Sequence, residues 1–340
     1  RCCVIRLHGV YSNKITIIRG TMNAIGGYFE LELPKNKVYH KKALALNTGR
    51  NAFEYVLRAN RYKKVYLPYF TCEAVLEPLK KNGIKYGFYN INEYLEPLFN
   101  YDSIKNNEAF LYTNYFGLKD AFIEKMATKI KNLIVDNSQA LFAKPIKNID
   151  TFYSPRKYVG VSDGAFLYCN KKLDFKLEKD ISYKRMSHLL IRADISAESG
   201  YNDFNYNDNS LINQPIKLMS NLTEKILKSI DFDEISKIRK RNFTFLNDNL
   251  KDINLLSFDF EQHSVPMVFP FKTKDSELKS RLQKHKIYCA SYWPNVLNWC
   301  ESDSLEVEMT KEIVSLPIDQ RYAKQDMCRI IKIIKNEYTR

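Results

Sequence analysis

The residues best suited to chemistry stand at two places about twenty positions apart. The first is the run 133–140, an apolar, strand-like stretch that leads into Asp136. The second is Lys157, which ends a short Ser-Pro-Arg-Lys sequence. A lysine amine can bond covalently to an aldehyde, and a carboxylate can keep a pyridine nitrogen protonated. These are two groups that a pyridoxal phosphate (PLP) enzyme needs, because the protonated ring accepts the electron pair released when an amino-acid Cα–H bond breaks.

Each of these residues also has an ordinary explanation. An acid after a buried strand often caps a helix, and most lysines are solvated surface residues. Gln139, three residues after Asp136, and the sequence Gly-Val-Ser-Asp-Gly after Lys157 favour the cofactor interpretation because they match the pattern of a known family. The two groups are therefore candidates because of their combination and order.

The order of these residues resembles the DegT/DnrJ/EryC1/StrS sugar aminotransferases, which are PLP enzymes. The family pattern is a strand ending in Asp, a small-small-Gln-Ala turn, an aromatic strand, the PLP lysine, and an acid-Gly pair six and seven residues later. The matches here are Val135-Asp136, Asn137-Ser138-Gln139-Ala140, Phe152-Tyr153, Lys157 and Asp163-Gly164. The resemblance runs from about Gly26 to the C-terminal helix. Related sugar dehydratases carry histidine in place of this lysine, so Lys157 favours transamination.

The resemblance implies fold type I, the α/β fold of aspartate aminotransferase. A large domain with a mostly parallel sheet is expected over residues 22–250, and a smaller α/β domain over 251–340. Residues 1–21 are interpreted as upstream or added sequence, because Met22 begins a stretch that is typical of family starts. They lack the continuous apolar core of a signal peptide.

Thr48, Gly49 and Arg50 stand just before a helical pattern. Free N–H groups at a helix N-terminus bind anions. The resemblance implies that these three residues hold the PLP phosphate, with Arg50 in place of the usual hydroxyl. The alternative is that Thr48 is an ordinary N-cap.

Other positions depart from the family pattern. The serine that the family places five residues before the lysine is Phe152 here, and Ser154 is the nearest candidate for the phosphate. The ring that stacks on PLP is expected where Cys72 stands, so either Cys72 covers the cofactor or Phe70 or Tyr69 does. Where the family has a histidine before the Asp strand, this chain has Asn114.

Aromatic residues near the C-terminus could contact the substrate. Tyr292 and Trp293 precede Pro294 in a turn that resembles one lining the family's active site. Their rings could pack on the apolar face of a sugar. Trp293 could equally belong to the core.

Composition limits the broad class. The chain has 340 residues, 45% hydrophobic and 27% charged, which is ordinary for a globular protein. No apolar run is long enough for a membrane helix, so a soluble protein is expected. The net charge of +14 is spread along the chain with acids interleaved, which favours a solvated basic surface and phosphorylated ligands over nucleic acid. Seven cysteines without C-x-x-C spacing favour a reducing, cytoplasmic location, and no metal site is expected.

Short β runs alternate with helical patterns, which predicts a mostly parallel sheet covered by helices. Strands are expected at 64–67, 85–89, 109–113, 132–136, 164–168 and 265–271. Helices are expected after Thr48, over 72–79, between 113 and 132, over 219–230 and at the C-terminus. The polar, Asn-rich run 201–210 is predicted to be a loop.

The resemblance implies a PLP-dependent aminotransferase that converts a nucleotide-linked keto-sugar to an amino sugar. By analogy with the family, glutamate is the amino donor, the enzyme is a homodimer, and the product serves surface-polysaccharide or related synthesis. The alternatives are a non-catalytic or regulatory protein on the same fold, another PLP-dependent sugar-modifying enzyme, and a basic binding protein whose match is at the level of the fold.

Overall fold

The computed structural model describes residues 25–258, 260–261 and 263–335. Contacts divide the chain into two units, Arg1–Leu33 and Pro34–Arg340. Residues 25–33, the described part of the first unit, contain no helix or strand. The expectations for residues 1–21 and Met22 lie outside the described residues, and the division of the remainder at residue 250 stays a prediction.

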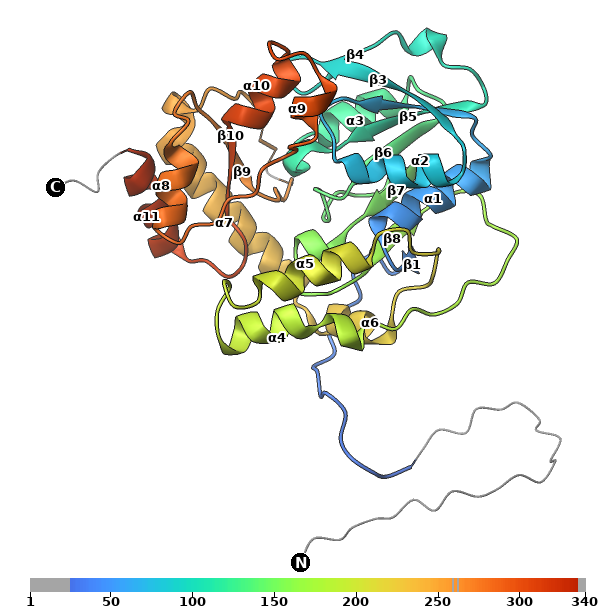
Figure 1. Cartoon of the computed structure of the whole chain (residues 1–340), viewed down its shortest axis with the longest axis horizontal. Helices are drawn as coiled ribbons and strands as arrows, with labels where there is room; N and C mark the ends of the chain where they lie inside the picture. Colours follow the sequence, from blue (N-terminus) through green and yellow to red (C-terminus); the bar gives the residue numbers. More distant parts are fainter. Residues whose placement is uncertain (1–24, 259, 262, 336–340) are drawn as a thin grey trace, which may run out of the picture. The chain divides into compact units, whose positions relative to one another are not determined.

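The second unit contains an eight-stranded sheet (Figure 1) in the order β1-β8-β7-β6-β5-β2-β3-β4. Strands β7, β6, β5, β2 and β3 run parallel to one another. Strands β1, β8 and β4 pair antiparallel with their neighbours. The sheet is thus mostly parallel, as predicted. The strands are β1 (Leu44–Leu46), β2 (Lys64–Pro68), β3 (Lys85–Ile91), β4 (Pro97–Leu98), β5 (Glu108–Thr113), β6 (Leu133–Asn137), β7 (Asp150–Tyr153) and β8 (Ala165–Tyr168).

Alternate residues of the central strands pack on opposite faces of the sheet. In β5, Ala109 and Leu111 belong to a core with helices α1 (Gly49–Asn60) and α2 (Leu76–Lys81). Phe110 and Tyr112 belong to the opposite core with helix α3 (Asp120–Ala127). All residues of β5 and β6 are buried, which explains their continuous apolar sequences.

The C-terminal part adds a two-stranded antiparallel sheet, β9 (Phe269–Lys272) with β10 (Ile313–Leu316). The long helix α7 (Phe232–Leu250) packs on α11 (Lys324–Ile334), and Phe243 and Ile330 lie in the same core as Phe110. Shorter helices are α8 (Leu278–Lys284), α9 (Val296–Trp299) and α10 (Leu305–Glu312). The strand expected over 265–271 begins only at Phe269, because the chain bends at Met267 and Val268 just before it.

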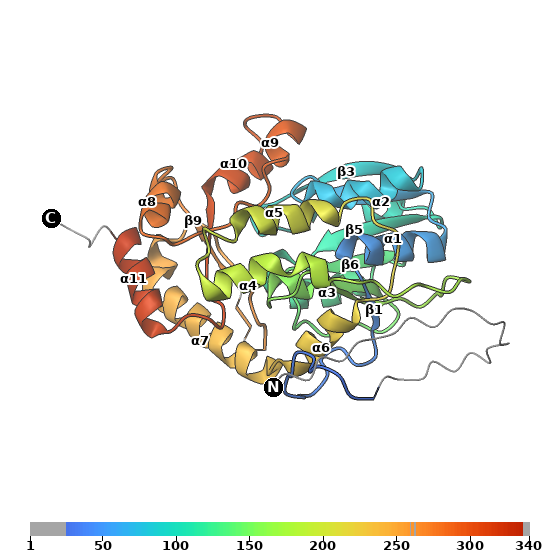
Figure 2. The same ribbon diagram turned by 60° about the horizontal axis from the view of Figure 1, so that its bottom comes forward.

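Helices α4 (Ser187–Asp194), α5 (Tyr201–Ser210) and α6 (Asn221–Ser229) follow the sheet, and α4 and α5 lie side by side (Figure 2). The prediction of a loop over 201–210 is therefore wrong. Asn and Asp weaken an isolated helix, but tertiary packing overrides that weak preference. The side chain of Asn207 is fully buried and donates to the Ser162 carbonyl over 3.0 Å.

Short 3-10 turns connect several elements; they span Glu73–Val75, Tyr101–Ser103, Tyr115–Gly117, Pro155–Lys157, Tyr183–Arg185 and Lys251–Ile253. The expected helix over 72–79 is divided between the first of these turns and α2. Within the part of the chain that the structure describes, no helix has both the length and the apolar character needed to cross a membrane.

Candidate active site

Asp136 lies near the carboxyl end of β6, paired with Thr113 of β5 and Phe152 of β7. The carboxyl ends of parallel strands share one edge of the sheet, which is where such folds place their ligands. The side chain is only 6% exposed, and one carboxylate oxygen accepts the Ser138 N–H over 2.7 Å. Burial raises the pKa of Asp136, while the charge of Lys157 and the bonds from Ser138 act in the opposite direction.

Lys157 ends the 3-10 turn that follows β7, so the same edge of the sheet carries it. Its side chain is exposed, and Nζ donates to Ser138 Oγ over 3.1 Å. Ser138 therefore connects the two predicted chemical groups, because its backbone binds Asp136 and its hydroxyl binds Lys157. Sequence reasoning treated Ser138 only as a small residue of a turn.

Gln139 is fully buried beneath the same edge. Its Oε1 accepts the Phe116 N–H over 2.8 Å, which fixes the orientation of the amide. The Nε2 atom is buried and has no hydrogen-bond partner among the described residues. Buried donors are normally paired, so an unpaired one three residues after Asp136 is suited to an acceptor on a ligand. This orphaned donor, the buried carboxylate and the exposed lysine together fit PLP.

Thr48 is the N-cap of α1, as the alternative interpretation held. Its hydroxyl accepts the Asn51 N–H over 3.0 Å, so this oxygen is already engaged. Gly49 is the first residue of the helix and has open space where a Cβ would stand. Arg50 follows, with its Nε 3.3 Å from Glu77 Oε2.

One hydrogen bond joins the start of α1 to the loop after Lys157. The Gly164 N–H donates to the Asn47 carbonyl over 2.5 Å. Gly164 has φ +116°, and a Cβ there would meet Met219 and Thr223 at 3.2 Å, so only glycine fits without strain. Asp163 beside it is fully buried and accepts from Ser220 and Thr223 at the start of α6. The acid-Gly pair of the sequence motif thus anchors this loop.

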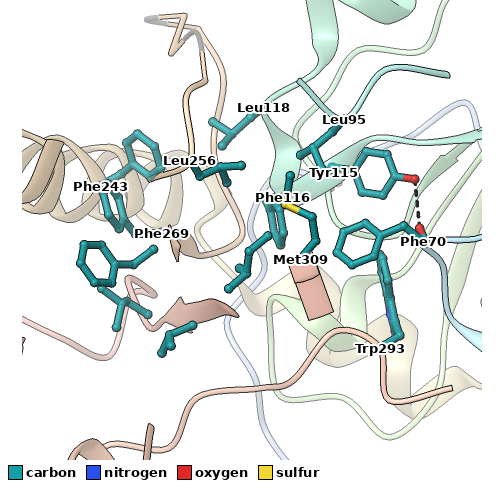
Figure 3. Packing of buried hydrophobic residues seen from close by; sticks show 14 of the residues in the cluster. Phe70, Leu95, Tyr115, Phe116, Leu118, Phe243, Leu256, Phe269, Trp293 and Met309 are labelled. Atoms are coloured by element: carbon teal, nitrogen blue, oxygen red, sulfur yellow. Dashed lines mark hydrogen bonds between the residues drawn. The ribbon is translucent and has the colours of Figure 1, made fainter. Parts of the chain in front are cut away.

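Two predicted aromatic contacts lie in the core. Phe70 is fully buried, its carbonyl accepts from the Tyr115 hydroxyl over 2.9 Å, and its ring meets the edge of Trp293 at 4.9 Å between centroids (Figure 3). Trp293 is 6% exposed in the same cluster. Tyr69 stacks on Phe88 at 4.7 Å. Three residues were considered for covering the cofactor ring. Phe70 and Tyr69 each pack on another aromatic ring, and Cys72 takes part in neither of these two pairs.

Of the remaining predicted residues, Ser154 lies in a loop and Asn114 belongs to a hydrogen-bond network. Ser154 is half-buried at the start of the turn that ends in Lys157, and its side chain does not cap that turn. Asn114 is fully buried and donates to Asp120 over 2.6 Å and to Asn137 over 3.0 Å, so it braces the strand ends.

Two cavities open beside Lys157, with volumes of about 1150 and 470 Å³. Lys157, Arg192, Arg239 and Arg321 line both, together with the acids Glu198 and Asp319. Tyr292 lines the smaller cavity, and burial raises the pKa of its hydroxyl to about 12. No sequence motif pointed to these arginines, because they come from elements far apart in the chain.

Arg239 fixes the segment that follows Lys157. Its guanidinium donates to the Met267 carbonyl over 2.8 Å and to the Tyr158 carbonyl over 3.3 Å, and it lies 4.5 Å from the centre of the Tyr158 ring. The Tyr158 hydroxyl in turn donates to the Gln139 carbonyl over 2.6 Å. Helix α7, the lysine loop and the Gln139 turn are thereby held together.

No protein-family model and no curated protein matches the chain. Solved structures do match over most of its length. A DegT DnrJ EryC1 StrS aminotransferase from Brucella abortus has a TM-score of 0.59 at 15% identity and covers 88% of this chain and 86% of its own. DesV from S. venezuelae, solved with a ketimine intermediate, has a TM-score of 0.61 at 16% identity and covers 88% and 85%.

A third match is the PLP form of the putative sugar aminotransferase Spr1654 from Streptococcus pneumoniae. Its TM-score is 0.59 at 13% identity, with 88% of this chain and 89% of that chain covered. At such low identity these likenesses establish the fold. The expectation of fold type I is therefore confirmed.

Proposed function

We propose that this chain is a PLP-dependent aminotransferase that makes an amino sugar from a nucleotide-linked keto-sugar, with glutamate as amino donor. The observation that carries the proposal is the cluster of Lys157, Ser138 and Asp136 at the carboxyl edge of β6 and β7. The fold supports it, because DesV and Spr1654, which share this fold, are described as bound to a ketimine intermediate and as a PLP form of a sugar aminotransferase.

The residues that would hold PLP each offer a different contact. Lys157 would bond to the aldehyde carbon, Asp136 would face the ring nitrogen, and the unpaired amide of Gln139 would donate to the ring oxygen. When bound, PLP supplies an electron sink for the pair released at the substrate's Cα. The protonated ring nitrogen would give the buried Asp136 carboxylate a second positive partner. Without the cofactor, Lys157 is the positive charge that favours its ionised form.

Lys157 is placed to move protons. Once its amine is free, Nζ can accept the proton from the donor's Cα and return it during the same half-reaction. The Ser138 hydroxyl holds Nζ at 3.1 Å, which limits the positions that this flexible side chain takes. Asp136 remains ionised throughout in this scheme.

The positive charge of the residues that line the two cavities supports the proposal of an anionic substrate. Arginines 156, 192, 239 and 321 and lysines 157 and 279 line the larger cavity, against the acids Glu198 and Asp319. This excess of positive charge raises the local concentration of anions such as a nucleoside diphosphate. The volume of about 1150 Å³ accommodates a nucleotide-linked sugar beside the cofactor.

The proposal includes a homodimer in the cytoplasm. Large apolar side chains on α4 and α5 are exposed, with Leu190 at 64%, Tyr201 at 59% and Tyr206 at 67%. Such residues are suited to a subunit interface beside the cavity. Seven cysteines without paired spacing favour a reducing compartment.

The first prediction concerns Lys157→Ala. The purified wild-type protein with PLP should show the visible absorption band of a lysine-bound cofactor and should release 2-oxoglutarate from glutamate in a single half-reaction. Lys157→Ala should lose both the band and the half-reaction, and the unfolding temperature should change little because the side chain is exposed. Spectroscopy and single-turnover assays measure these effects.

Lys144→Ala is the matched control, because this lysine is also exposed but lies in an irregular segment outside both cavity walls. A Lys157→Ala variant with the wild-type band and turnover would refute the proposal. A wild type that forms the band but reacts with no amino acid would favour the non-catalytic alternative. Screening keto-sugars against the glutamate-loaded enzyme then identifies the acceptor.

A further inference from the structure

The smaller of the two cavities beside Lys157 has a wall of its own in the C-terminal part of the chain. Ser315 of β10 lines this cavity and does not line the larger one. Its backbone pairs with Pro270 of β9 and forms a second bridge to Ala290, which lines the same cavity. Ser315 therefore lies where separate segments of the chain meet at the cavity wall.

The hydroxyl of Ser315 is buried and unpaired. The residue is 2% exposed, and its Oγ has no hydrogen-bond partner in the described part of the chain. Burying a hydroxyl without a partner costs free energy, so such groups are normally paired. An acceptor on a ligand in the smaller cavity would supply the missing partner.

Arg239 brings a second buried donor to the same cavity. Its side chain is 2% exposed and lines both cavities. The terminal nitrogens donate to the Met267 and Tyr158 carbonyls, but Nε has no partner within the ranges that the structure describes. Met267 also lines the smaller cavity and stands two residues before β9, the strand that pairs with Ser315. A guanidinium donor and a hydroxyl, both unpaired, therefore belong to one cavity.

The acids that line the smaller cavity are already engaged. Glu198 lies 3.5 Å from the Lys286 ammonium, and Asp319 lies 2.7 Å from the Arg321 guanidinium. Asp326 accepts a backbone N–H over 2.8 Å at the start of α11. These carboxylates therefore do little to neutralise the other cations of the wall.

Cations without a carboxylate partner remain in the same wall. Lys157, Arg192 and Arg239 line the smaller cavity, and none of them forms an ion pair with a carboxylate of the described residues. The cavity therefore favours an anion. Its volume of about 470 Å³ suits a small molecule. Apolar side chains complete the wall and suit a short hydrocarbon chain; they are Met267, Val268, Ile287, Pro317 and Ile330.

We propose that Ser315 and Arg239 bind a carboxylate group of the amino donor and that Ser315 makes the smaller cavity specific for it, which rests on the proposed function. A carboxylate accepts from a hydroxyl and from a guanidinium at once, and both bonds are charge-assisted. The acceptor sugar reaches Lys157 from the larger cavity, whose wall does not include Ser315. The two half-reactions then use different side chains to recognise their substrates.

The test uses two ligands that cannot react. Glutarate carries two carboxylates and no amine, and UDP is a probe of the larger cavity. Calorimetry measures the affinity of wild type and of Ser315→Ala for each ligand in the presence of PLP. Ser315→Ala should bind glutarate about ten- to a hundred-fold more weakly and UDP as well as wild type does. Its unfolding temperature without ligand should not fall, because the lost hydroxyl has no partner among the described residues.

Thr310→Val is the matched control. Thr310 is also buried in the C-terminal part and lines neither cavity, but its hydroxyl is paired and donates to the Glu306 carbonyl over 2.8 Å. This variant should bind glutarate and UDP as wild type does. Equal losses of glutarate and UDP affinity in Ser315→Ala would overturn the proposal, and so would a lower unfolding temperature of that variant.

The half-reactions with glutamate and glutamine identify which carboxylate is bound. A higher KM for both amino acids in Ser315→Ala assigns the α-carboxylate, which both carry. A higher KM for glutamate alone assigns the side-chain carboxylate, which glutamine lacks. An unchanged KM for both amino acids contradicts the proposal.

The proposed function can fail separately. A wild type that forms no lysine-bound PLP band but binds glutarate through Ser315 would lose the aminotransferase assignment and keep the carboxylate site. A wild type that reacts with glutamate, together with a Ser315→Ala variant of unchanged glutarate affinity, would keep the assignment and lose the site. A wild type that binds no glutarate also removes the site.

Discussion

Burial makes the ionised form of the Asp136 carboxylate less favourable than it is in water. It is 6% exposed, and its pKa is raised by burial despite the nearby Lys157 and Ser138. An acid whose folded pKa lies above its unfolded value contributes stability at low pH and loses it as pH rises through the folded pKa. At neutral pH its ionised form therefore destabilises the protein without cofactor.

Asp136→Asn should accordingly raise the unfolding temperature of the apo-protein at pH 7 and have little effect near pH 3. The same variant should still bind PLP through Lys157, yet turnover should fall by orders of magnitude, because no charge holds the ring proton. Thermal unfolding at the two pH values and single-turnover kinetics measure this. Exposed Asp102→Asn is the control. Lower stability together with normal turnover would return Asp136 to a structural role.

At the scale of elements, α5 depends on one buried amide. Asn207 is fully buried and donates to the Ser162 carbonyl, in the loop between Lys157 and Gly164. Asn207→Ala should cost about 1–3 kcal/mol of unfolding free energy, because the buried carbonyl loses its donor. Denaturant unfolding measures the loss.

The matched control is Asn202→Ala, which alters an exposed position in the same helix. It should leave stability unchanged or slightly higher, because alanine is the better helix former. Equal effects of the two substitutions would mean that α5 is held by its apolar contacts instead.

Most central elements could be predicted from local pattern. The buried strands β5 and β6 are continuous apolar runs, and α11 carries Met327, Ile330 and Ile331 at helical spacing. The helix α5 could not, since its support comes from Ser162 and from α4. Side-chain direction in irregular segments was also beyond sequence reasoning: Phe70 and Trp293 face each other in the core.

In the candidate site too, residues set by local sequence pattern could be predicted, and residues set by tertiary contacts could not. Asp136 and Lys157 were recognisable because motif spacing reflects strand ends and turns. Arg156 and Arg239 were not, because their contacts join segments far apart in the sequence: Arg156 pairs with Asp208 of α5, and Arg239 of α7 donates to the Tyr158 carbonyl.

At the scale of the whole molecule, His40 makes stability depend on pH. Its Nε2 is 2.7 Å from the Leu141 carbonyl and its Nδ1 is 3.2 Å from the Tyr168 hydroxyl, while the rings of Tyr39, Tyr153 and Phe166 surround it. Burial lowers the pKa of His40 to about 4, and the Leu141 carbonyl opposes this shift. The unfolded chain therefore binds this proton at higher pH than the folded chain does.

Stability from His40 should be complete above pH 6.5 and be lost as pH falls from about 6.5 to about 4, by roughly 3 kcal/mol at most. His40→Gln should flatten that part of the unfolding profile. His263→Gln, at a side chain that is 70% exposed, should leave it intact. An NMR titration that places the His40 pKa near 6.5 would contradict this account.

The hydrogen bond from Gly164 to Asn47 has a geometric consequence. Strands β1 and β8 are neighbours in the sheet, with Leu46 opposite Ala165. The segment before α1 and the loop that follows Lys157 are thus joined to each other where β1 and β8 pair. The sheet therefore limits how far the start of α1 and the lysine loop can move apart, so a ligand that contacts both would meet them at a nearly constant separation.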